Sequence, residues 1–310
     1  MAPVIALVGP TGVGKSGWAL QLAQELPLEI ISVDSAQVYV GLDIGSAKPS
    51  AAEQALVPHH LIDIRDPAQG YSAGDFARDA RAAIAAIHAR GRVPLLVGGT
   101  LLYLRALYRG MAVLPAASPE VRARLDAEAD ALGWGALHAR LRELDPDAAA
   151  RIHPNDPQRI QRALEVHALT GERISSLQSA TRGAAGEFRW LRHALWPQDR
   201  AAHAEVLAQR FDAMLRAGLC AEVQRLYARG DLRAAMPAIR SVGYRQLWEW
   251  CAGDASLEQA RARAIAATRQ LCKRQMTWLR AEKDMDRWEA GAPGEFRKWR
   301  KNIVSQLQHG

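Results

Sequence analysis

The chain has 310 residues, 49% of them hydrophobic, and a formal net charge of +7. This length allows a full α/β core together with an additional module. No stretch reaches the roughly 20 consecutive apolar residues that cross a membrane, and the first residues show no basic leader or cleavage site. We therefore expect no membrane contact, no secretory signal and a cytoplasmic location. The three cysteines are far apart and lack C-x-x-C spacing, which disfavours a zinc site or a disulfide framework.

The first predicted element is a short apolar strand at residues 4–8 that runs into a glycine-rich loop. The loop GPTGVGKS, from Gly9 to Ser16, fits the pattern G-x-x-x-x-G-K-[ST], and the amphipathic segment after it predicts a helix. In such a loop the backbone N–H groups point at a phosphate, Lys15 reaches the outer phosphate and Ser16 can bind a magnesium ion. The pattern predicts a site for a diphosphate or triphosphate and leaves the reaction open.

Two more strands are predicted at residues 29–33 and 93–97. The carboxyl ends of parallel strands meet at one edge of a sheet, so Asp34 is expected to open onto the same crevice as the loop. A carboxylate there suits chemistry, although a lone aspartate after a strand more often caps a helix or a turn. In nucleotide hydrolases, a strand like the one at 93–97 often ends in a magnesium-binding aspartate. Here Gly98-Gly99-Thr100 follows it, so the chain is poorly equipped to hydrolyse ATP.

A third apolar run at residues 59–64 begins with two histidines that lack further ligands at metal spacing. Ser72 or Asp75 is expected to cap the next helix, and residues 101–107 begin another. From residue 116 to 182 the composition changes to Ala, Arg, Glu and Leu at helical spacing. This change predicts an insertion of three helices, at residues 119–132, 134–144 and 156–170.

The pattern beyond the insertion predicts a return to the core. Residues 189–196 predict a strand, and residues 199–229 predict a long helix or a pair of helices. Residues 257–283 give the longest helical pattern, with an apolar stripe beside a basic face. Such a face is ordinarily a solvated surface, but with a phosphate loop and a positive net charge it favours a polyanionic partner. The basic tail after residue 296 is expected to fray.

These elements predict an α/β fold, a P-loop NTPase-like parallel sheet flanked by helices, with a helical insertion domain. The expected division assigns residues 1–115 to the first part of the core and residues 116–182 to the insertion. Residues 183–310 form the second part of the core and carry the basic C-terminal helices. A hinge is expected at residues 183–186.

Seven motifs together resemble one family, the tRNA dimethylallyltransferases, also called tRNA isopentenyltransferases. The resemblance runs from the first strand to about Arg280. Ser16 stands where a threonine is usual, which is neutral for magnesium binding, and Val40 stands where an arginine is common, which weakens any charge assigned to that loop. The motifs are GPTGVGKS at 9–16, DSAQVY at 34–39, DIGSAKP at 43–49, HHLIDI at 59–64, GGTLLYLRAL at 98–107, HPNDPQRIQRALEV at 153–166 and TRQLCKRQMTWLR at 268–280.

The resemblance implies transfer of a dimethylallyl group from dimethylallyl diphosphate to the exocyclic N6 amine of the adenosine 3′ of the anticodon. The tRNAs would be those reading codons that begin with U, and diphosphate would be released. An aromatic amine is a weak nucleophile, so the reaction needs a base and a stabilised leaving group. By resemblance Asp34 is the base, Thr100 hydrogen-bonds the oxygen between carbon and phosphorus, and Lys15 with Mg²⁺ at Ser16 neutralises the diphosphate. The implied donor site is Gly9, Pro10, Thr11, Gly12, Val13, Gly14, Lys15 and Ser16.

The resemblance also implies a surface for the tRNA anticodon stem-loop, to which the insertion contributes. Flipping the target base from its stack costs a few kcal/mol, which contacts elsewhere on the RNA must offset. One stem-loop needs no partner subunit, so a monomer is expected. The implied tRNA-binding residues are Asp34, Ser35, Ala36, Gln37, Thr100, Arg122, Gln158, Arg159, Ile160, Gln161, Arg162, Arg240, Ser241, Val242, Gly243, Tyr244, Arg245, Lys273, Arg274, Gln275, Met276, Thr277, Trp278, Leu279 and Arg280.

Two other classes of function remain open from the residues alone. A small-molecule or nucleoside kinase would bind ATP in the same loop, and the loop by itself favours that reading. The missing acid after residues 93–97 and the lack of a recognisable lid arginine pattern count against it. A non-catalytic RNA-binding module is the third candidate, but it needs neither a phosphate loop nor Asp34.

Overall fold

The computed structural model describes residues 1–110, 112, 114–179 and 187–308. It divides the chain into two compact units. The first, which we call the core unit, comprises Met1–Leu107 and Ala185–Gly310, and the second, the helical unit, comprises Tyr108–Ala184. The sequence placed these boundaries at 115 and 182, eight and two residues away. The predicted hinge at 183–186 lies outside the described residues.

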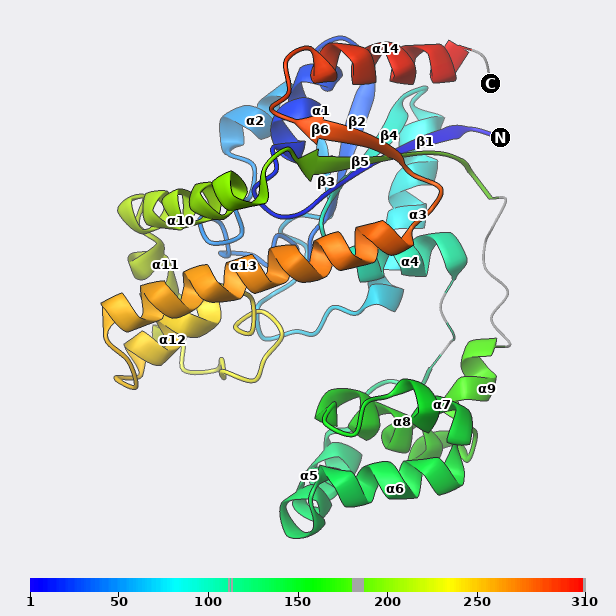
Figure 1. Ribbon diagram of the computed structural model, residues 1–310, viewed down its shortest axis with the longest axis vertical. Helices are drawn as coiled ribbons and strands as arrows, with labels where there is room; N and C mark the ends of the chain where they lie inside the picture. Colours follow the sequence, from blue (N-terminus) through cyan, green and yellow to red (C-terminus); the bar gives the residue numbers. More distant parts are fainter. Residues whose placement is uncertain (111, 113, 180–186, 309–310) are drawn as a thin grey trace. The chain divides into compact units, whose positions relative to one another are not determined.

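The core unit is built on a parallel sheet with the strand order β3-β2-β4-β1-β5-β6 (Figure 1). The central strands β1 and β4 are apolar along their whole length because helices cover both faces of a parallel sheet. The P-loop NTPase-like α/β fold expected from the sequence is confirmed. The strands are β1 (Pro3–Val8), β2 (Leu28–Val33), β3 (His59–His60), β4 (Val93–Gly98), β5 (Arg189–Pro197) and β6 (Asp286–Ala290).

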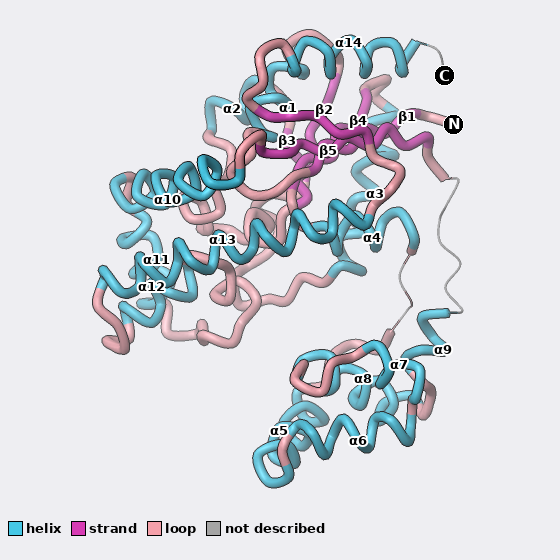
Figure 2. The backbone as a smooth tube through the Cα atoms, viewed as in Figure 1, coloured by secondary structure: helices cyan, strands magenta, loops and turns pink. Residues whose placement is uncertain are grey.

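Helices surround this sheet (Figure 2). The helix after Ser72 begins with a capping box, in which Ser72 and Asp75 each bond the other's backbone N–H, so both predicted caps contribute. The predicted segment 199–229 is a pair of helices separated at Gly218. The core helices are α1 (Lys15–Ala23), α2 (Ala51–Leu56), α3 (Ala73–Ala89), α4 (Leu101–Arg109), α10 (Arg200–Arg216), α11 (Leu219–Ala228), α12 (Tyr244–Cys251), α13 (Leu257–Ala281) and α14 (Glu295–Gln308).

The helical unit has an apolar core of its own, centred on Leu125, Leu141 and Leu164. The three predicted helices are present, and two short helices that the pattern did not predict join them. No helix in the described ranges combines the length and the apolarity needed to cross a bilayer. The helices of this unit are α5 (Pro119–Leu132), α6 (Trp134–Leu144), α7 (Pro146–Arg151), α8 (Pro157–Thr170) and α9 (Ile174–Ser179).

The C-terminal tail differs from its prediction. The sequence predicts that it frays, but residues 286–290 add the edge strand β6 and residues 295–308 form α14. Trp299 is fully buried, and its ring centroid lies 5.2 Å from that of Trp18 on α1. Burial of this aromatic side chain outweighs the charge of the basic residues beside it, because a buried aromatic contributes several kcal/mol.

The apolar run at 59–64 forms only a short strand in the structure. Only His59 and His60 pair with β2. Leu61 and Asp63 adopt positive φ angles of 62° and 54°, which end the strand in a tight turn.

Candidate active site

The phosphate loop lies between β1 and α1 at the carboxyl edge of the sheet. Gly12 and Gly14 have φ angles of 75° and 95°, which glycine adopts without strain. A Cβ on Gly12 would lie 2.7 Å from the Leu207 side chain of α10, so the loop also needs glycine there for close packing. The loop therefore has the geometry that the sequence pattern predicts for a phosphate cradle.

Lys15 is the cation of this loop. Its Nζ donates hydrogen bonds to the carbonyls of Gly9 and Pro10, at 3.0 and 2.8 Å. Burial, followed by repulsion from Arg210, lowers the pKa of Lys15 to about 8, and the carboxylate of Asp34 opposes this shift. An anion bound in the loop would stabilise the charged form of Lys15.

Two polar side chains of α10 reach the loop, and neither was predicted. The His203 imidazole donates through Nε2 to the carbonyl of Thr11 at 3.0 Å. Arg210 lines the cavity beside the loop, where burial lowers its pKa while Asp34 raises it. Arg210 follows Leu207 by three residues and therefore lies on the buried face of α10. A charged residue at a position where the helical pattern of α10 predicts an apolar one was the signal that could have revealed Arg210.

Asp34 and Thr100 follow two strands that pair directly, β2 and β4, where Val33 is in register with Gly98. The Ser35 N–H donates to Thr100 Oγ1 at 3.2 Å, so the Asp34 turn and Thr100 are joined. Asp34 Oδ1 accepts the Ala36 N–H at 2.8 Å, as an ordinary turn aspartate does. Its other oxygen, Oδ2, makes no hydrogen bond to any residue that the structure describes. Asp34 thus holds the turn through Oδ1, while Oδ2 is available to accept a proton.

Gln275 of α13 connects the phosphate loop to the end of β4. Its Oε1 accepts the Thr11 N–H at 2.9 Å, and its Nε2 donates to the Gly99 carbonyl at 2.9 Å. The resemblance assigned Gln275 to the tRNA surface. The structure gives its amide an internal bridging position, since both ends of the amide are bonded to the chain.

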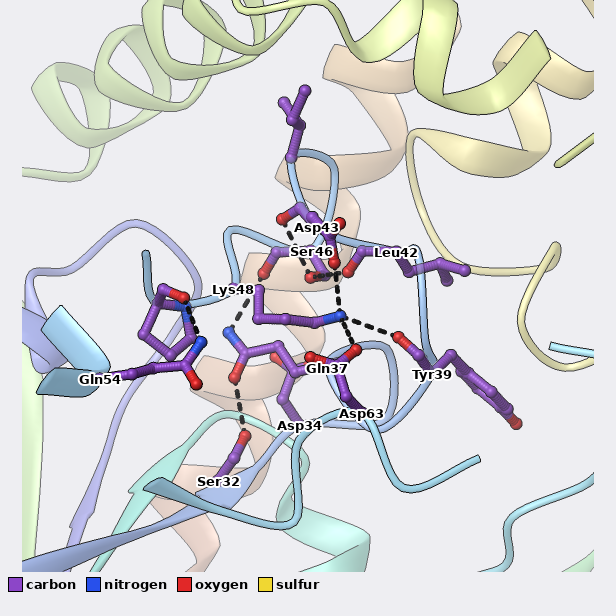
Figure 3. Close-up of polar contacts among 12 residues, drawn as sticks. Ser32, Asp34, Gln37, Tyr39, Leu42, Asp43, Ser46, Lys48, Gln54 and Asp63 are labelled. Carbon is purple, nitrogen blue, oxygen red and sulfur yellow. Dashed lines mark hydrogen bonds and ion pairs between the residues drawn. The ribbon is translucent and has the colours of Figure 1, made fainter. Parts of the chain in front are cut away.

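A cavity of about 450 Å³ opens between these elements. The loop residues Ser46–Pro49 form part of its wall. Figure 3 shows how that wall is held: Lys48 donates to Tyr39 O at 2.9 Å and to Asp43 at 2.6 Å, and it also pairs with Asp63. The lysine side chain is only 4% exposed. This arrangement makes the loop a fixed wall of the cavity.

The residues that the resemblance implies for tRNA contact include both buried and exposed side chains. Ile160, Tyr244, Met276 and Leu279 are at most 6% exposed, so their side chains pack in the core and do not face a ligand. For these four the implied contact with tRNA stays a prediction that only the backbone could fulfil, because these side chains fill the interior. The exposed polar members are Ser35, Gln158, Arg159, Arg240, Arg245, Lys273, Arg274, Thr277 and Arg280.

Two of the predicted RNA contacts are ion-paired to the same buried carboxylate inside the helical unit. Arg122 donates to both oxygens of Glu165, at 2.9 and 3.1 Å, and Arg162 donates to the same carboxylate at 2.6 Å. Glu165 is fully buried and also accepts the Ser118 N–H. Arg122 therefore fastens α5 to α8, while Arg162 pairs within α8 and also donates to the Pro115 carbonyl at 2.8 Å.

Ser16 is exposed at the first turn of α1, on the cavity wall. Among the described residues, no group of three His, Cys, Asp or Glu side chains is arranged to hold a metal ion. A hydroxyl at a phosphate loop suits Mg²⁺, which keeps most of its water and phosphate ligands and needs few from the protein. The donor set here fits a phosphate-bound magnesium ion.

The sheet, the loop and the strand ends define the class of the protein, a P-loop α/β protein whose site joins an anion cradle to a carboxylate. Over residues 37–282 the chain matches the family described as IPP transferase. It is 58% identical to the tRNA dimethylallyltransferase of Bordetella pertussis over 281 residues, 90% of each chain. It is 52% identical to that of Methylococcus capsulatus, covering 99% of this chain and 98% of the other.

Solved structures agree with these relatives. The tRNA isopentenylpyrophosphate transferase of Bacillus halodurans superposes with a TM-score of 0.73 at 35% identity, covering 99% of this chain and 97% of that one. A eukaryotic dimethylallyltransferase acting on tRNA has a TM-score of 0.79 at 28% identity, covering 99% and 77%. The chain belongs to the tRNA dimethylallyltransferase family and is a prenyltransferase. These findings do not favour the kinase alternative.

Proposed function

We propose that this enzyme transfers the dimethylallyl group of dimethylallyl diphosphate to the N6 amine of the adenosine 3′ of the anticodon, in tRNAs reading codons that begin with U. The assignment of roles to the site residues rests on one observation. The phosphate loop with Lys15 and Arg210 opens into the same cavity as Asp34, and Thr100 is bonded to the Asp34 turn. An anionic leaving group and a proton acceptor can therefore meet across one reacting carbon.

The donor is held by its diphosphate. The N–H groups of the loop and the start of α1 supply the positive end of a helix dipole, while Lys15 and Arg210 supply full charges. Magnesium bound at Ser16 would neutralise further charge on the leaving oxygens. Gly99 and Thr100 follow β4 at the position where nucleotide hydrolases often have an aspartate. Because that acid is missing, the site is poorly equipped for hydrolysis, which supports a diphosphate that leaves intact.

The acceptor is activated by the strand ends. The bond between the allylic carbon and the bridging oxygen breaks, and its electron pair leaves with the diphosphate. A bond forms from N6 to that carbon, and the proton of the amine passes to Asp34 Oδ2. The Thr100 hydroxyl, which accepts from Ser35, is free to donate to the bridging oxygen as negative charge develops there.

The RNA partner is the anticodon stem-loop. The exposed basic side chains of residues 240–245 and 273–280 support this assignment, because contacts to phosphate provide most of the affinity for RNA. We propose a cytoplasmic monomer, since a single stem-loop fills a single site.

Mass analysis of the nucleosides formed from tRNA and dimethylallyl diphosphate tests the reaction. We expect one adenosine per substrate tRNA to gain a dimethylallyl group on N6. In parallel, thermal unfolding with magnesium should show stabilisation by dimethylallyl diphosphate and little by ATP. Brisk consumption of ATP with unaltered adenosines would support a kinase instead.

A further inference from the structure

Glu222 of α11 is a buried carboxylate that binds two separate segments of the core unit. It is 2% exposed. Its oxygens accept the backbone N–H groups of Asp43, Ile44 and Gly45 at 3.2, 2.8 and 3.2 Å. They also accept the Tyr244 hydroxyl at 2.6 Å. Among the residues that the structure describes, no cation pairs with Glu222, so these four donors replace the water that its charge has lost.

The contact with Tyr244 does not depend on the hydroxyl alone. A Cβ on Gly45 would lie 2.7 Å from the Tyr244 ring and 2.9 Å from Leu219, so the ring packs directly on this glycine. Tyr244 is the first residue of α12 and follows the exposed Arg240 by four residues. Two independent contacts therefore tie the stretch 240–245 to the loop 43–47.

The other end of that loop is bonded to the turn that carries Asp34. Gln37 Nε2 donates to the carbonyls of Ser46 and Ala47, at 3.3 and 3.1 Å (Figure 3). Gln37 Oε1 accepts the Ser32 hydroxyl at 2.7 Å, which fixes the orientation of the amide. The Gln37 N–H in turn points at Asp34 Oδ1, at 3.4 Å. The loop thus has Glu222 at one end and the proposed base at the other.

We propose that Glu222 is a positioning residue that couples the RNA-contacting stretch 240–245 to the turn of Asp34. The proposal rests on the proposed function, in which Asp34 accepts the proton and residues 240–245 meet the stem-loop. Only a carboxylate accepts at both oxygens. Each oxygen accepts at least one backbone N–H, so a glutamine would face one of these N–H groups with its own NH₂ in either orientation, and the loop would lose that bond.

Steady-state kinetics of Glu222→Gln test this role. We expect kcat to fall about tenfold, while the affinity for dimethylallyl diphosphate, measured by calorimetry, changes by less than about twofold. Tyr244→Phe keeps the ring on Gly45 and removes one donor, so we expect mainly a higher KM for tRNA. Glu29→Gln is the matched control, because Glu29 is a buried carboxylate at the opposite end of β2, bonded to Arg90 and His60.

Hydrogen exchange separates this proposal from the proposed function. Binding of an anticodon stem-loop should slow amide exchange in residues 40–49 of the wild type, and Glu222→Gln should abolish this response without preventing RNA binding. A wild type that transfers no dimethylallyl group overturns the proposed function, while the exchange response still reports the coupling. Unchanged exchange in the wild type, or an equal loss of kcat in Glu29→Gln at matched thermal stability, overturns the role of Glu222.

Discussion

The Gln275 side chain accepts a hydrogen bond from the Thr11 N–H at 2.9 Å, although the two residues are 264 positions apart. The same amide donates to Gly99 O, so one side chain of α13 holds the phosphate loop against the end of β4. α13 also carries the exposed Lys273 and Arg280. One helix therefore both braces the donor site, through Gln275, and carries these basic side chains.

Replacement of Gln275 tests this bridge. Gln275→Glu keeps an acceptor for Thr11 but places negative charge against the Gly99 carbonyl and in the diphosphate site. We expect the Kd for dimethylallyl diphosphate to rise by about tenfold or more, since an unmade buried hydrogen bond costs about 1–3 kcal/mol. Calorimetry measures this, and Thr277→Ala, on the exposed side of the helix, should leave donor binding unchanged.

Asp34→Asn separates the two roles of this side chain. The amide oxygen still accepts the Ala36 N–H, so the turn survives, but the group no longer takes a proton. We expect kcat to fall by about 10²- to 10⁴-fold with donor affinity retained. Rapid-quench measurement of transfer and calorimetry with the donor provide the two readouts. Undiminished turnover would remove Asp34 from the mechanism.

The lowered pKa of Lys15 predicts how the affinity for the donor depends on pH. Its pKa is lowered to about 8, so the free enzyme loses this charge as pH rises through that value, and diphosphate binding must then take up a proton. Donor affinity should be flat from about pH 7 to pH 8 and should weaken by up to about tenfold per unit above pH 8. The phosphate itself ionises near about pH 6, below this window. Lys15→Ala should bind more weakly at every pH and show no break.

A side chain at Gly98 is expected to lower the stability of the fold by steric clash alone. A Cβ there would fall inside van der Waals distance of the Val33 backbone, where β2 and β4 meet. We expect Gly98→Ala to lower the free energy of unfolding by about 1–3 kcal/mol, the usual cost of overpacking. Gly17→Ala is the control, because a Cβ on Gly17 meets nothing within 4 Å and alanine favours the helix. Denaturant unfolding compares the two variants.

The basic side chains predict a steep salt dependence. For contacts to single-stranded phosphates, log K against log salt should fall with a slope of about −0.7 per neutralised phosphate. Lys273→Ala should make this slope shallower by about one such step while leaving donor affinity unchanged. Fluorescence anisotropy with a labelled anticodon stem-loop at several salt concentrations measures it. A flat response in the wild type would mean that these residues are ordinary solvated surface.

The sequence alone determined the local features of this protein. The spacing of Gly9, Gly14 and Lys15 between a strand and a helix predicts the phosphate loop, because each residue acts on its near neighbours. Helical spacing predicts α5, α6 and α8 for the same reason. The parallel sheet followed from strands that alternate with helices, and the order of the motifs indicated the family.

Only the tertiary structure decided which distant side chains meet. Gln275 and Arg210 reach the phosphate loop, and Glu222 reaches the loop 43–45, from helices more than 170 residues away in the chain. No periodicity encodes such contacts, since they depend on how helices pack across the sheet. The tail was mispredicted for the same reason: its basic composition was visible, but the burial of Trp299 against Trp18 needs both ends of the chain folded together.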